Sequence, residues 1–324
     1  MTLCYLYAFV SGFTDAANSV ATAVGSRAIS PTVAVLLAGG LALVGGLTGT
    51  AVAKMIAKGI VDAQAISLAV VAAGLAAAMT WSLFTYRYGI PVSETHGLIG
   101  GLVGAAIAYA GPSVVLWGGL NKILIAVVAS PVLGFVGGLV FIAVIYRLFR
   151  RAPRPVLQPI FLNLQRLSAT FMAFSHGRND AQKPMGVMAV TLAIYSGRTE
   201  ITVPLWVIVS AAFLLSLGVA YGGWRIIRTL GMKITRMDPT HGFAAETSGA
   251  LVLQGASVLG IPVSTTHTIT SAIVGVGVGR RLSGVAWGLT RDIAISWALT
   301  LPLTVLLGVA YLYLLQGLAR LLSG

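Results

Sequence analysis

Long uncharged stretches, separated by a few charged residues each, dominate the pattern of hydrophobic and polar positions along the chain. Each stretch is longer than the roughly 20 residues that an α-helix needs to cross a hydrocarbon core of about 30 Å. Backbone groups in lipid find partners only within a helix or a closed barrel, and the short alternating segments of a membrane barrel do not occur here. The pattern therefore predicts an all-α polytopic membrane protein. The uncharged stretches cover residues 28–53, 63–86, 95–121, 123–146, 201–224, 247–279 and 293–319.

Composition and charge agree with this class. Of the 324 residues, 57% are hydrophobic and 9% are charged, whereas about 25% of a soluble domain is charged. The formal net charge of +13 is concentrated in short segments, which the positive-inside rule places in the cytoplasm. A nucleic-acid partner would need a soluble basic face with stacking aromatic residues, so we expect none. We expect a multi-pass protein of the cell (inner, cytoplasmic) membrane. The basic segments contain Arg147, Arg150, Arg151 and Arg154, then Arg225, Arg228, Lys233 and Arg236, then Arg280 and Arg281.

The first apolar segment lacks a basic start and is interrupted by Asp15. We therefore expect it to belong to the mature protein rather than to act as a signal peptide. Cys4 is the only cysteine, which excludes an intrachain disulfide and disfavours a cysteine-based metal site. The histidines and this cysteine match no zinc motif.

Two motifs occur twice, in the same order. The acidic motif reads SGFTDAAN around Asp15 and SHGRNDAQ around Asp180. The second motif reads GIPVSETH at 89–96 and GIPVSTTH at 260–267. Internal duplication is typical of secondary transporters, whose binding site lies where the repeats meet. The chain is therefore divided into a first membrane repeat (1–146), a basic cytoplasmic linker (147–159) and a second membrane repeat (160–324).

The distribution of basic residues favours inverted topology for the two repeats. A second repeat that leaves the cytoplasm at the linker would return to it at the basic loop 225–236. Segments 243–259 and 262–279 would then form a re-entrant helical hairpin. The first repeat would run the opposite way, with Lys54 and Lys58 outside, against the positive-inside rule.

Asp15 and Asp180 lie in segments apolar enough for a membrane interior, where an ionisable residue costs roughly 2.5–3.5 kcal/mol and indicates a functional site. Asp15 has no basic neighbour in the sequence, so a cation such as sodium is its simplest partner. Asn18 shares its helix face, and Asn179 and Asp180 would supply matching oxygen ligands, which suit hard cations. Asp180 has an alternative partner, Lys183, one helical turn away.

Gly12, Gly177 and Pro184 flank the two acids and indicate broken helices. Such breaks are tolerated in lipid only where the freed backbone groups find partners. They leave carbonyl groups for a cation and N–H groups for an anion.

The duplicated second motif has the features of an anion site. A Gly-Ile-Pro turn is followed by Ser and Thr residues that cap a helix. A helix N-terminus combines free N–H donors with a positive dipole end, and two of them at a repeat interface suit a tetrahedral oxyanion. An ordinary capping box without a ligand is the alternative. The candidate hydroxyl donors are Ser93, Thr95, Ser264, Thr265 and Thr266.

Several titratable side chains near these motifs have two interpretations. Glu94 is either a local capping residue or a proton site. His96 and His267 occupy matching positions, and His176 lies in the second acidic motif; each is either a site residue or a structural hydrogen-bond partner. Glu246 begins a long uncharged stretch and is a further intramembrane acid, unless it is only a favourable charge at a helix N-terminus.

These motifs resemble those of the inorganic phosphate transporter (PiT) family, in its bacterial low-affinity form. The sequences that carry the resemblance are GFTDAAN, HGRNDAQKPMG, the segment 222–250 and GIPVSTTHTITSAIVGVG. The resemblance therefore extends over both halves of the chain. The resemblance implies a phosphate symporter with inverted repeats, driven by Na⁺ or H⁺, and suggests a homodimer. The residues to which it gives cation or phosphate roles are Asp15, Asn18, Ser93, Asn179, Asp180, Glu246 and Ser264, and we add Lys183 as a phosphate ligand.

The sequence departs from the family pattern at three places. Lys183 stands where the first half has Asn18, so the halves cannot ligate identically. Many members carry a glutamate near the position of Ala42, and its absence removes one coupling-ion or proton site. Glu94 replaces the usual Ser or Thr, which can alter stoichiometry or selectivity.

We therefore predict a secondary active transporter that imports inorganic phosphate by Na⁺ or H⁺ symport through alternating access. A sulfate or other oxyanion permease on the same scaffold is the alternative. An intramembrane Ser–His–Asp enzyme would leave the duplication unexplained, and a passive channel would not require two buried acids. The expected partners are phosphate, the coupling ion and the lipid bilayer, with no cofactor.

Overall fold

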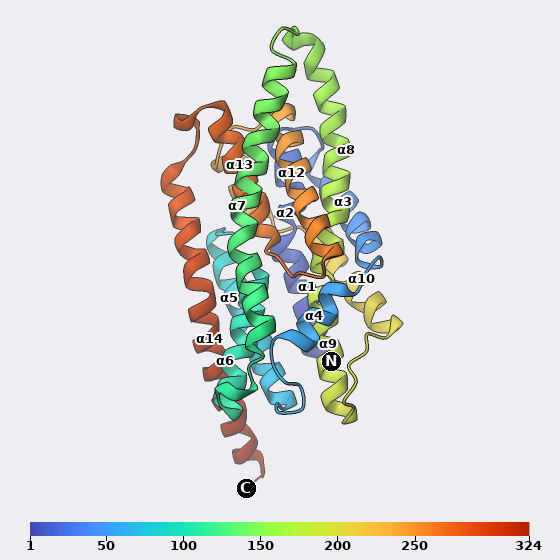
Figure 1. The fold of residues 1–324 in the computed structure, drawn as a ribbon, viewed down its shortest axis with the longest axis vertical. Helices are drawn as coiled ribbons and strands as arrows, with labels where there is room; N and C mark the ends of the chain where they lie inside the picture. Colours follow the sequence, from blue (N-terminus) through green and yellow to red (C-terminus); the bar gives the residue numbers. More distant parts are fainter. Residues whose placement is uncertain (324) are drawn as a thin grey trace.

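The computed structural model describes residues 1–323, in which helices are joined by turns and loops, no strand is present and two isolated antiparallel bridges occur. The predicted all-helical class is confirmed. Figure 1 shows the helices of both halves in one bundle, with the two chain termini toward its lower end. The elements are α1 (Thr2–Asp15), α2 (Ala17–Gly25), α3 (Pro31–Gly46), α4 (Ala51–Gly59), α5 (Leu68–Tyr88), α6 (Glu94–Ala110), η1 (Pro112–Val114), α7 (Trp117–Leu148), α8 (Arg154–Asp180), α9 (Gln182–Ser196), α10 (Leu205–Tyr221), α11 (Trp224–Arg228), η2 (Thr229–Lys233), α12 (Pro239–Val258), α13 (Thr265–Arg280), η3 (Leu282–Gly284) and α14 (Trp287–Ser323).

Each acidic motif interrupts a helix at its aspartate. Helix α1 ends at Asp15 and α2 begins two residues later, and α8 ends at Asp180 in the same way. Ala16 and Ala181, between the helices, keep right-handed helical dihedral angles. The interruptions are therefore one residue long, and they free fewer backbone groups than an unwound segment would. In the second half Pro184 explains the interruption, because it has no N–H for the carbonyl group of Asp180.

One predicted crossing segment is divided. The uncharged stretch 28–53 forms α3 and the start of α4, with a bend of 71° between the two helices. Helix α10 and the α11–η2 segment form a similar pair, bent by 57°. Helices α5, α7 and α14 are each long and apolar enough to cross a membrane on their own, so residues 1–323 contain three such spans, or five if each bent pair is counted as one.

The second motif starts a helix in both halves, as the sequence predicted. The Ser93 hydroxyl accepts from the His96 N–H at 3.2 Å, and the Ser264 hydroxyl accepts from the His267 N–H at 3.1 Å. The two serines are therefore genuine N-caps of α6 and α13.

The two halves interleave rather than stand apart. Helix α7 of the first half packs along α13, and α14 of the second half packs along α6. The isolated bridges, Val61 with Val115 and Thr235 with Val285, occupy matching places before α7 and α14. Helix α7 runs to Leu148 and α8 begins at Arg154, so only 149–153 of the basic segment lies outside helices.

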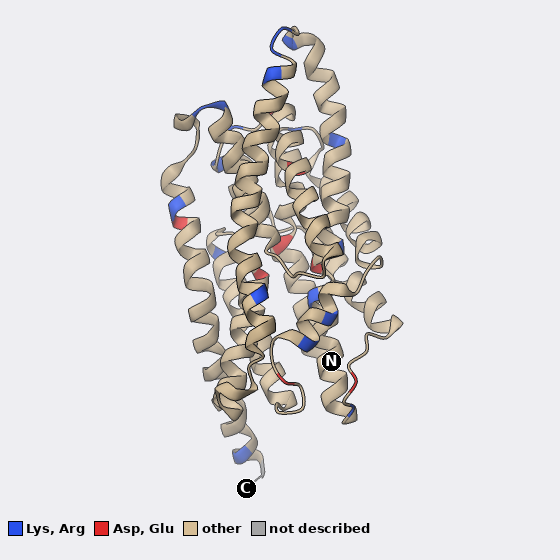
Figure 2. Ribbon diagram, in the orientation of Figure 1, with Lys and Arg blue, Asp and Glu red and all other residues tan. Residues whose placement is uncertain are grey.

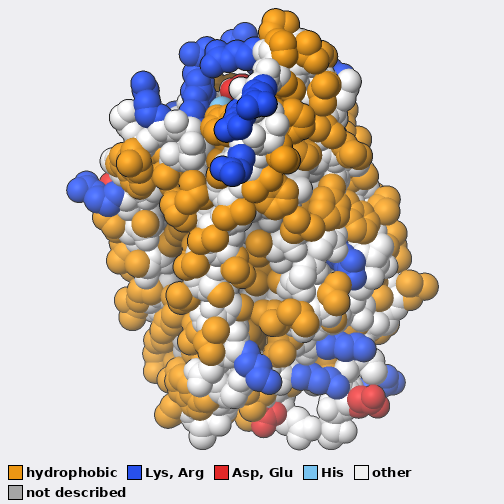
Figure 3. Space-filling model, turned by 45° about the horizontal axis from the view of Figure 1, so that its top comes forward, with side chains coloured by type: hydrophobic (Ala, Val, Ile, Leu, Met, Phe, Trp, Pro, Cys, Tyr) orange, Lys and Arg blue, Asp and Glu red, His pale blue; other side chains and the backbone are white. Residues whose placement is uncertain are grey.

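Charge and apolar surface are separated along the bundle. Basic residues gather at the upper end of Figure 2, around the α7–α8 connection and the end of α13. Apolar side chains cover much of the flank in Figure 3. Among the exposed apolar side chains, Ile125 of α7 is 69% exposed and Leu306 of α14 is 64% exposed. Such an apolar belt suits lipid rather than water.

Glycines allow α1 and α10 to cross at close range. A Cβ atom added to Gly12 of α1 would lie 2.0 Å from the Leu215 carbonyl oxygen of α10. On the facing helix, a Cβ atom added to Gly218 would lie 2.2 Å from the Phe9 carbonyl oxygen. This close approach fixes the helix that carries Asp15.

We predict that Gly12→Ala destabilises the protein by about 1–3 kcal/mol, because the new methyl group forces α1 and α10 apart. Thermal unfolding of the purified protein in detergent measures the change. Gly40→Ala is the matched control, since nothing lies within 4 Å of its added Cβ atom and alanine is the better helix former. Equal unfolding midpoints for Gly12→Ala and the unsubstituted protein would contradict the prediction.

Candidate functional site

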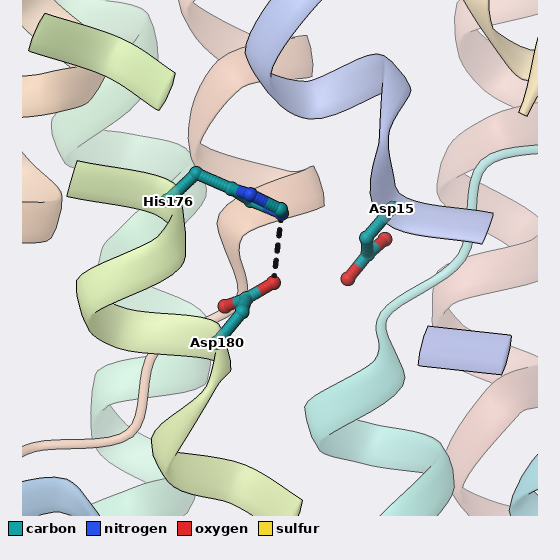
Figure 4. A group of neighbouring side chains, drawn as sticks. All are labelled: Asp15, His176 and Asp180. Atoms are coloured by element: carbon teal, nitrogen blue, oxygen red, sulfur yellow. Dashed lines mark ion pairs between the residues drawn. The ribbon is translucent and has the colours of Figure 1, made fainter. Parts of the chain in front are cut away.

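The two acidic motifs meet inside the bundle. Asp15, His176 and Asp180 each place one side-chain ligand atom within 4.8 Å of the other two. Figure 4 shows Asp15 reaching from α1 toward the pair that His176 and Asp180 form on α8. All three side chains are buried, with exposures of 3%, 0% and 0%. The sequence prediction that the halves share one acidic centre agrees with this placement.

Asp180 is surrounded by donors. Its Oδ1 atom lies 2.8 Å from Lys183 Nζ, and its Oδ2 atom lies 3.1 Å from His176 Nε2. The Thr265 hydroxyl donates to Oδ2 at 3.0 Å. The local ion pair with Lys183, which the sequence left open, is therefore present. It also occupies the amino group that we expected to bind phosphate.

Asp15 has no basic partner among the described residues. Its Oδ1 atom accepts from the Thr266 hydroxyl at 2.9 Å, and its Oδ2 atom has no donor. Asn18 Oδ1 and Asn179 Oδ1 are likewise buried without donors within residues 1–323. Buried oxygen atoms of this kind require a partner. Carboxylate and amide oxygens are ligands that hard cations prefer, so these atoms form a candidate cation site.

The start of α13 connects the two acids. Asn18 Nδ2 donates to the hydroxyl oxygens of Thr265 and Thr266 at 3.1 and 2.9 Å. Those hydroxyls donate in turn to Asp180 and Asp15. The two threonines predicted to bind an anion therefore hold the acids in this structure, and the anion must compete for them or use other donors.

Free backbone donors remain at the two helix starts. The first helical bonds of α6 and α13 are made by Gly97 and Thr268, so the N–H groups of the first two residues of each helix have no intrahelical acceptor. The helix starts lie side by side, because the Thr95 hydroxyl donates to the Val263 carbonyl oxygen at 3.0 Å. Their N–H groups and dipoles can bind one anion together.

Glu94 adds a third carboxylate to this region. Its Oε1 atom accepts from the Thr14 hydroxyl at 2.7 Å, and its buried Oε2 atom has no donor among the described residues. Thr14 is the residue directly before Asp15. The carboxyl groups of Asp15, Asp180 and Glu94 and the amino group of Lys183 are therefore all buried in the interior of the bundle, and Lys183 contacts Asp180.

The histidines of the second motif contact one another and a tryptophan. The rings of His96 and His267 lie 4.8 Å apart between centroids, and the His267 ring stacks on Trp297 at 4.0 Å. These ring contacts give both histidines a packing role in this structure, and a role at the site stays a prediction.

Glu246 occupies a separate cage of donors. Its carboxylate accepts from the Thr22 hydroxyl at 2.6 Å, from Gln165 Nε2 at 3.2 Å and from the Ser168 hydroxyl. The Ser26 hydroxyl donates to Gln165 Oε1 at 2.7 Å. Ser26 also lines a cavity of about 880 Å³ at the basic end of the bundle, so hydrogen bonds lead from this cavity to Glu246.

Sequence reasoning missed several polar residues near the acids. Ser257 accepts from Asn179 at 3.1 Å. Tyr7 and Ser11 carry buried hydroxyl groups without a hydrogen-bond partner among the described residues. A signal for this second group existed, because residues 7, 11 and 15 are spaced by four and share a helix face.

An all-helical bundle with an apolar flank and a buried, charged centre is typical of membrane transport proteins. Residues 11–308 match the phosphate transporter family, and the chain belongs to that family, for which phosphate is the substrate. A probable low-affinity inorganic phosphate transporter of Rhizobium meliloti is 44% identical over 95% of this chain and 92% of its own length.

A second relative and a solved structure agree. A Bacillus subtilis protein, also described as a probable low-affinity inorganic phosphate transporter, is 39% identical over 97% of this chain and 96% of its own length. The solved structure described as the sodium-dependent phosphate transporter superposes with a TM-score of 0.88, with 28% identity and 97% coverage of both chains. The family resemblance that the motifs predicted is confirmed.

The unequal pairing of the two acids leads to a stability prediction. Asp180→Asn should destabilise the protein by about 3–5 kcal/mol, because it leaves Lys183 buried without an anionic partner. Asp15→Asn should cost little or nothing, because it removes a carboxylate that has no basic partner. Thermal unfolding in detergent without phosphate measures both changes.

The double variant Asp180→Asn/Lys183→Met is the control, since it removes both charges and should regain much of the lost stability. Equal losses for Asp15→Asn and Asp180→Asn would show that the ion pair does not distinguish the two halves.

Proposed function

We propose that this chain imports inorganic phosphate by cation symport, through alternating access between two inverted repeats in the cytoplasmic membrane. The observation that carries the proposal is the central group of three carboxylates and one lysine beside the starts of α6 and α13. Such a group excludes an anion while its carboxylates are bare and admits one once cations neutralise them.

The charge of the substrate supports coupling to cations. By analogy with a phosphoryl group, phosphate carries about −1.5 to −2 charge near neutral pH. Moving each negative charge inward against a negative-inside potential costs about 2.3 kcal/mol per 100 mV. Cations that enter with phosphate offset this cost and remove its repulsion from the carboxylates of Asp15 and Glu94.

The oxygen atoms available as ligands favour Na⁺ over H⁺ as the ion at Asp15. Amide oxygens coordinate metal cations but do not take up a proton near neutral pH, and Asn18 and Asn179 each present an unpartnered amide oxygen. Asp15 would supply the charge of the site. Asp180 would act as a shared neighbour whose charge Lys183 already balances.

Phosphate would sit against the free N–H groups at the starts of α6 and α13. Glu94, the first residue of α6, has an unpartnered Oε2 atom. This atom can accept a hydrogen bond from a protonated phosphate oxygen, whereas sulfate has no proton to donate. The placement of Glu94 therefore favours phosphate over the sulfate alternative.

Helix directions support the inverted repeats. In Figure 1 the N-terminus lies toward the lower end, whereas α8 descends from the upper end. The two helices that carry the acids therefore begin at opposite ends of the bundle. We place the basic upper end in the cytoplasm, and Glu246 is then a second cation or proton site on the inner side.

Uptake into proteoliposomes tests the function. Labelled phosphate should accumulate when an inward Na⁺ gradient is imposed, and an H⁺ gradient alone should drive little uptake. Excess sulfate should compete weakly. Accumulation that is the same with and without either gradient would refute symport, and uptake driven by the H⁺ gradient alone would refute Na⁺ as the coupling ion.

Asp15→Asn should reduce Na⁺-driven phosphate uptake by at least tenfold, because the site loses its charged ligand. Asp292→Asn is the matched control: Asp292 has an exposed side chain on α14, 3.6 Å from Arg291, and its loss should leave uptake unchanged. Stability of each variant is measured alongside. Near-normal Na⁺-driven uptake in a stable Asp15→Asn variant would contradict the cation role.

A further inference from the structure

Three lysines line one cavity, and no acidic side chain of the described residues lines it. The cavity has a volume of about 830 Å³ and lies between α4, the start of α7 and the α12–α13 turn. Lys54 and Lys58 come from α4 and Lys122 from α7. Figure 2 shows basic positions on these helices in the lower half of the bundle, away from the arginine-rich loops at the upper end.

These lysines have no anionic partner within the described chain. No ion pair among residues 1–323 includes Lys54, Lys58 or Lys122, and all three side chains are exposed. Lysines that share a cavity repel one another. A cavity lined by charge of one sign also concentrates the field and attracts counter-ions.

Close packing holds the lysine-bearing helices together. A Cβ atom added to Gly119 of α7 would lie 2.1 Å from the Gly59 carbonyl oxygen of α4. The end of α4 and the start of α7 therefore touch backbone to backbone. Lys58 and Lys122 lie close to this contact in the sequence, so the basic lining is built into the crossing of two helices.

Helix α4 is joined directly to the central acidic motif. Gln182, the second residue after Asp180, accepts with Oε1 from the Val52 N–H at 2.8 Å and from the Ala53 N–H at 3.3 Å. These N–H groups belong to the first turn of α4, which has no intrahelical acceptor for them.

The opposite wall of the cavity leads to the anion-binding helix. Residues 258–260 line the cavity and precede the Ser264 cap of α13 by a few residues. Gly260 adopts a left-handed conformation with φ +68°, and an added Cβ atom would lie 3.3 Å from Ala51. Two segments that are connected to the central site therefore bound the cavity. One is α4, whose first turn is hydrogen-bonded to Gln182, and the other is the turn that precedes α13.

We propose that Lys54, Lys58 and Lys122 form a basin that collects free phosphate on the side opposite the arginine-rich loops and supplies it to the central site. This inference rests on the proposed function and assigns a second, weaker phosphate site to the same transporter. It also explains why lysines occupy a face that the positive-inside rule would keep free of them.

An anionic lipid headgroup presents the same chemistry to lysine, and it is the competing source. The basin adjoins the turn that leads to the α13 start, which favours the soluble ion. The experiment therefore contains an arm without anionic lipid.

The test compares phosphate uptake by the unsubstituted protein with that of Lys54→Gln/Lys58→Gln/Lys122→Gln. In cells that lack other phosphate uptake, KM for external phosphate should rise roughly three- to tenfold at low ionic strength, with kcat nearly unchanged, as loss of electrostatic attraction predicts. Added choline chloride at constant Na⁺ should reduce the difference, because salt screens exposed charges.

Lys54→Arg/Lys58→Arg/Lys122→Arg is the matched control, since it keeps the charge and should keep the original KM. The glutamine variant is then assayed in vesicles of phosphatidylcholine alone. A KM defect that persists there supports free phosphate, and a defect that disappears there assigns the basin to lipid and overturns the proposal.

Two further outcomes are distinguishable. If the unsubstituted protein takes up no phosphate, the proposed function fails. If it takes up phosphate and the glutamine variant has the original KM at low ionic strength, the basin alone is refuted. Equal salt dependence in the unsubstituted and glutamine variants would also overturn it.

Discussion

Repulsion between two buried carboxylates is the constraint on which the centre of this protein depends. Asp15 and Asp180 approach within 4.8 Å in a region closed to bulk water, where like charges repel far more strongly than in solution. Each half responds differently. Lys183 and His176 contact Asp180 directly, whereas Asp15 receives only a hydroxyl group from Thr266. The carboxyl group of the first half therefore lacks a basic partner among the described residues, and a bound cation can supply the missing positive charge.

Because the two carboxyl groups lie so close together, the residues at the start of α13 that hydrogen-bond to both of them are central to the site. A hydroxyl group donates and accepts at once, so Thr265 and Thr266 link Asn18 to both acids. Any ligand that displaces one of these bonds alters contacts in both halves. The matching start of α6 cannot behave alike, because Glu94 stands where the second half has Thr265 and accepts from Thr14 instead. The proposed coupling of cation and anion thus rests on shared hydroxyl groups, and the asymmetry of the centre follows from two differences between the repeats, Lys183 for Asn18 and Glu94 for Thr265.

Much of this arrangement is readable in the sequence, for identifiable reasons. The helical class follows from uncharged length, and the N-caps Ser93 and Ser264 follow from local turn chemistry, which depends only on neighbouring residues. The meeting of Asp15 and Asp180 is predictable because the duplicated motifs of a transporter meet at one binding site. The bend between α3 and α4 is not predictable from the sequence, because the stretch that forms them is uncharged throughout. The donors around Glu246 come from α2 and α8, and no local pattern reveals which distant helices pack together.

The two ends of the bundle differ in a way that suits transport. At the basic end, hydrogen bonds run from the cavity at Ser26 through Gln165 to Glu246. At the other end, Gln182 connects the acidic motif to α4 and its lysines. Each route is made of side chains on helix ends rather than of an open passage, so access at either end requires a helix end to shift. Because Gln182 follows Asp180 by two residues, a shift of α4 cannot occur without disturbing the segment that carries the acid. In the proposed alternating-access mechanism, opening toward the lysines would therefore be linked to the state of the central charges through the Gln182 hydrogen bonds.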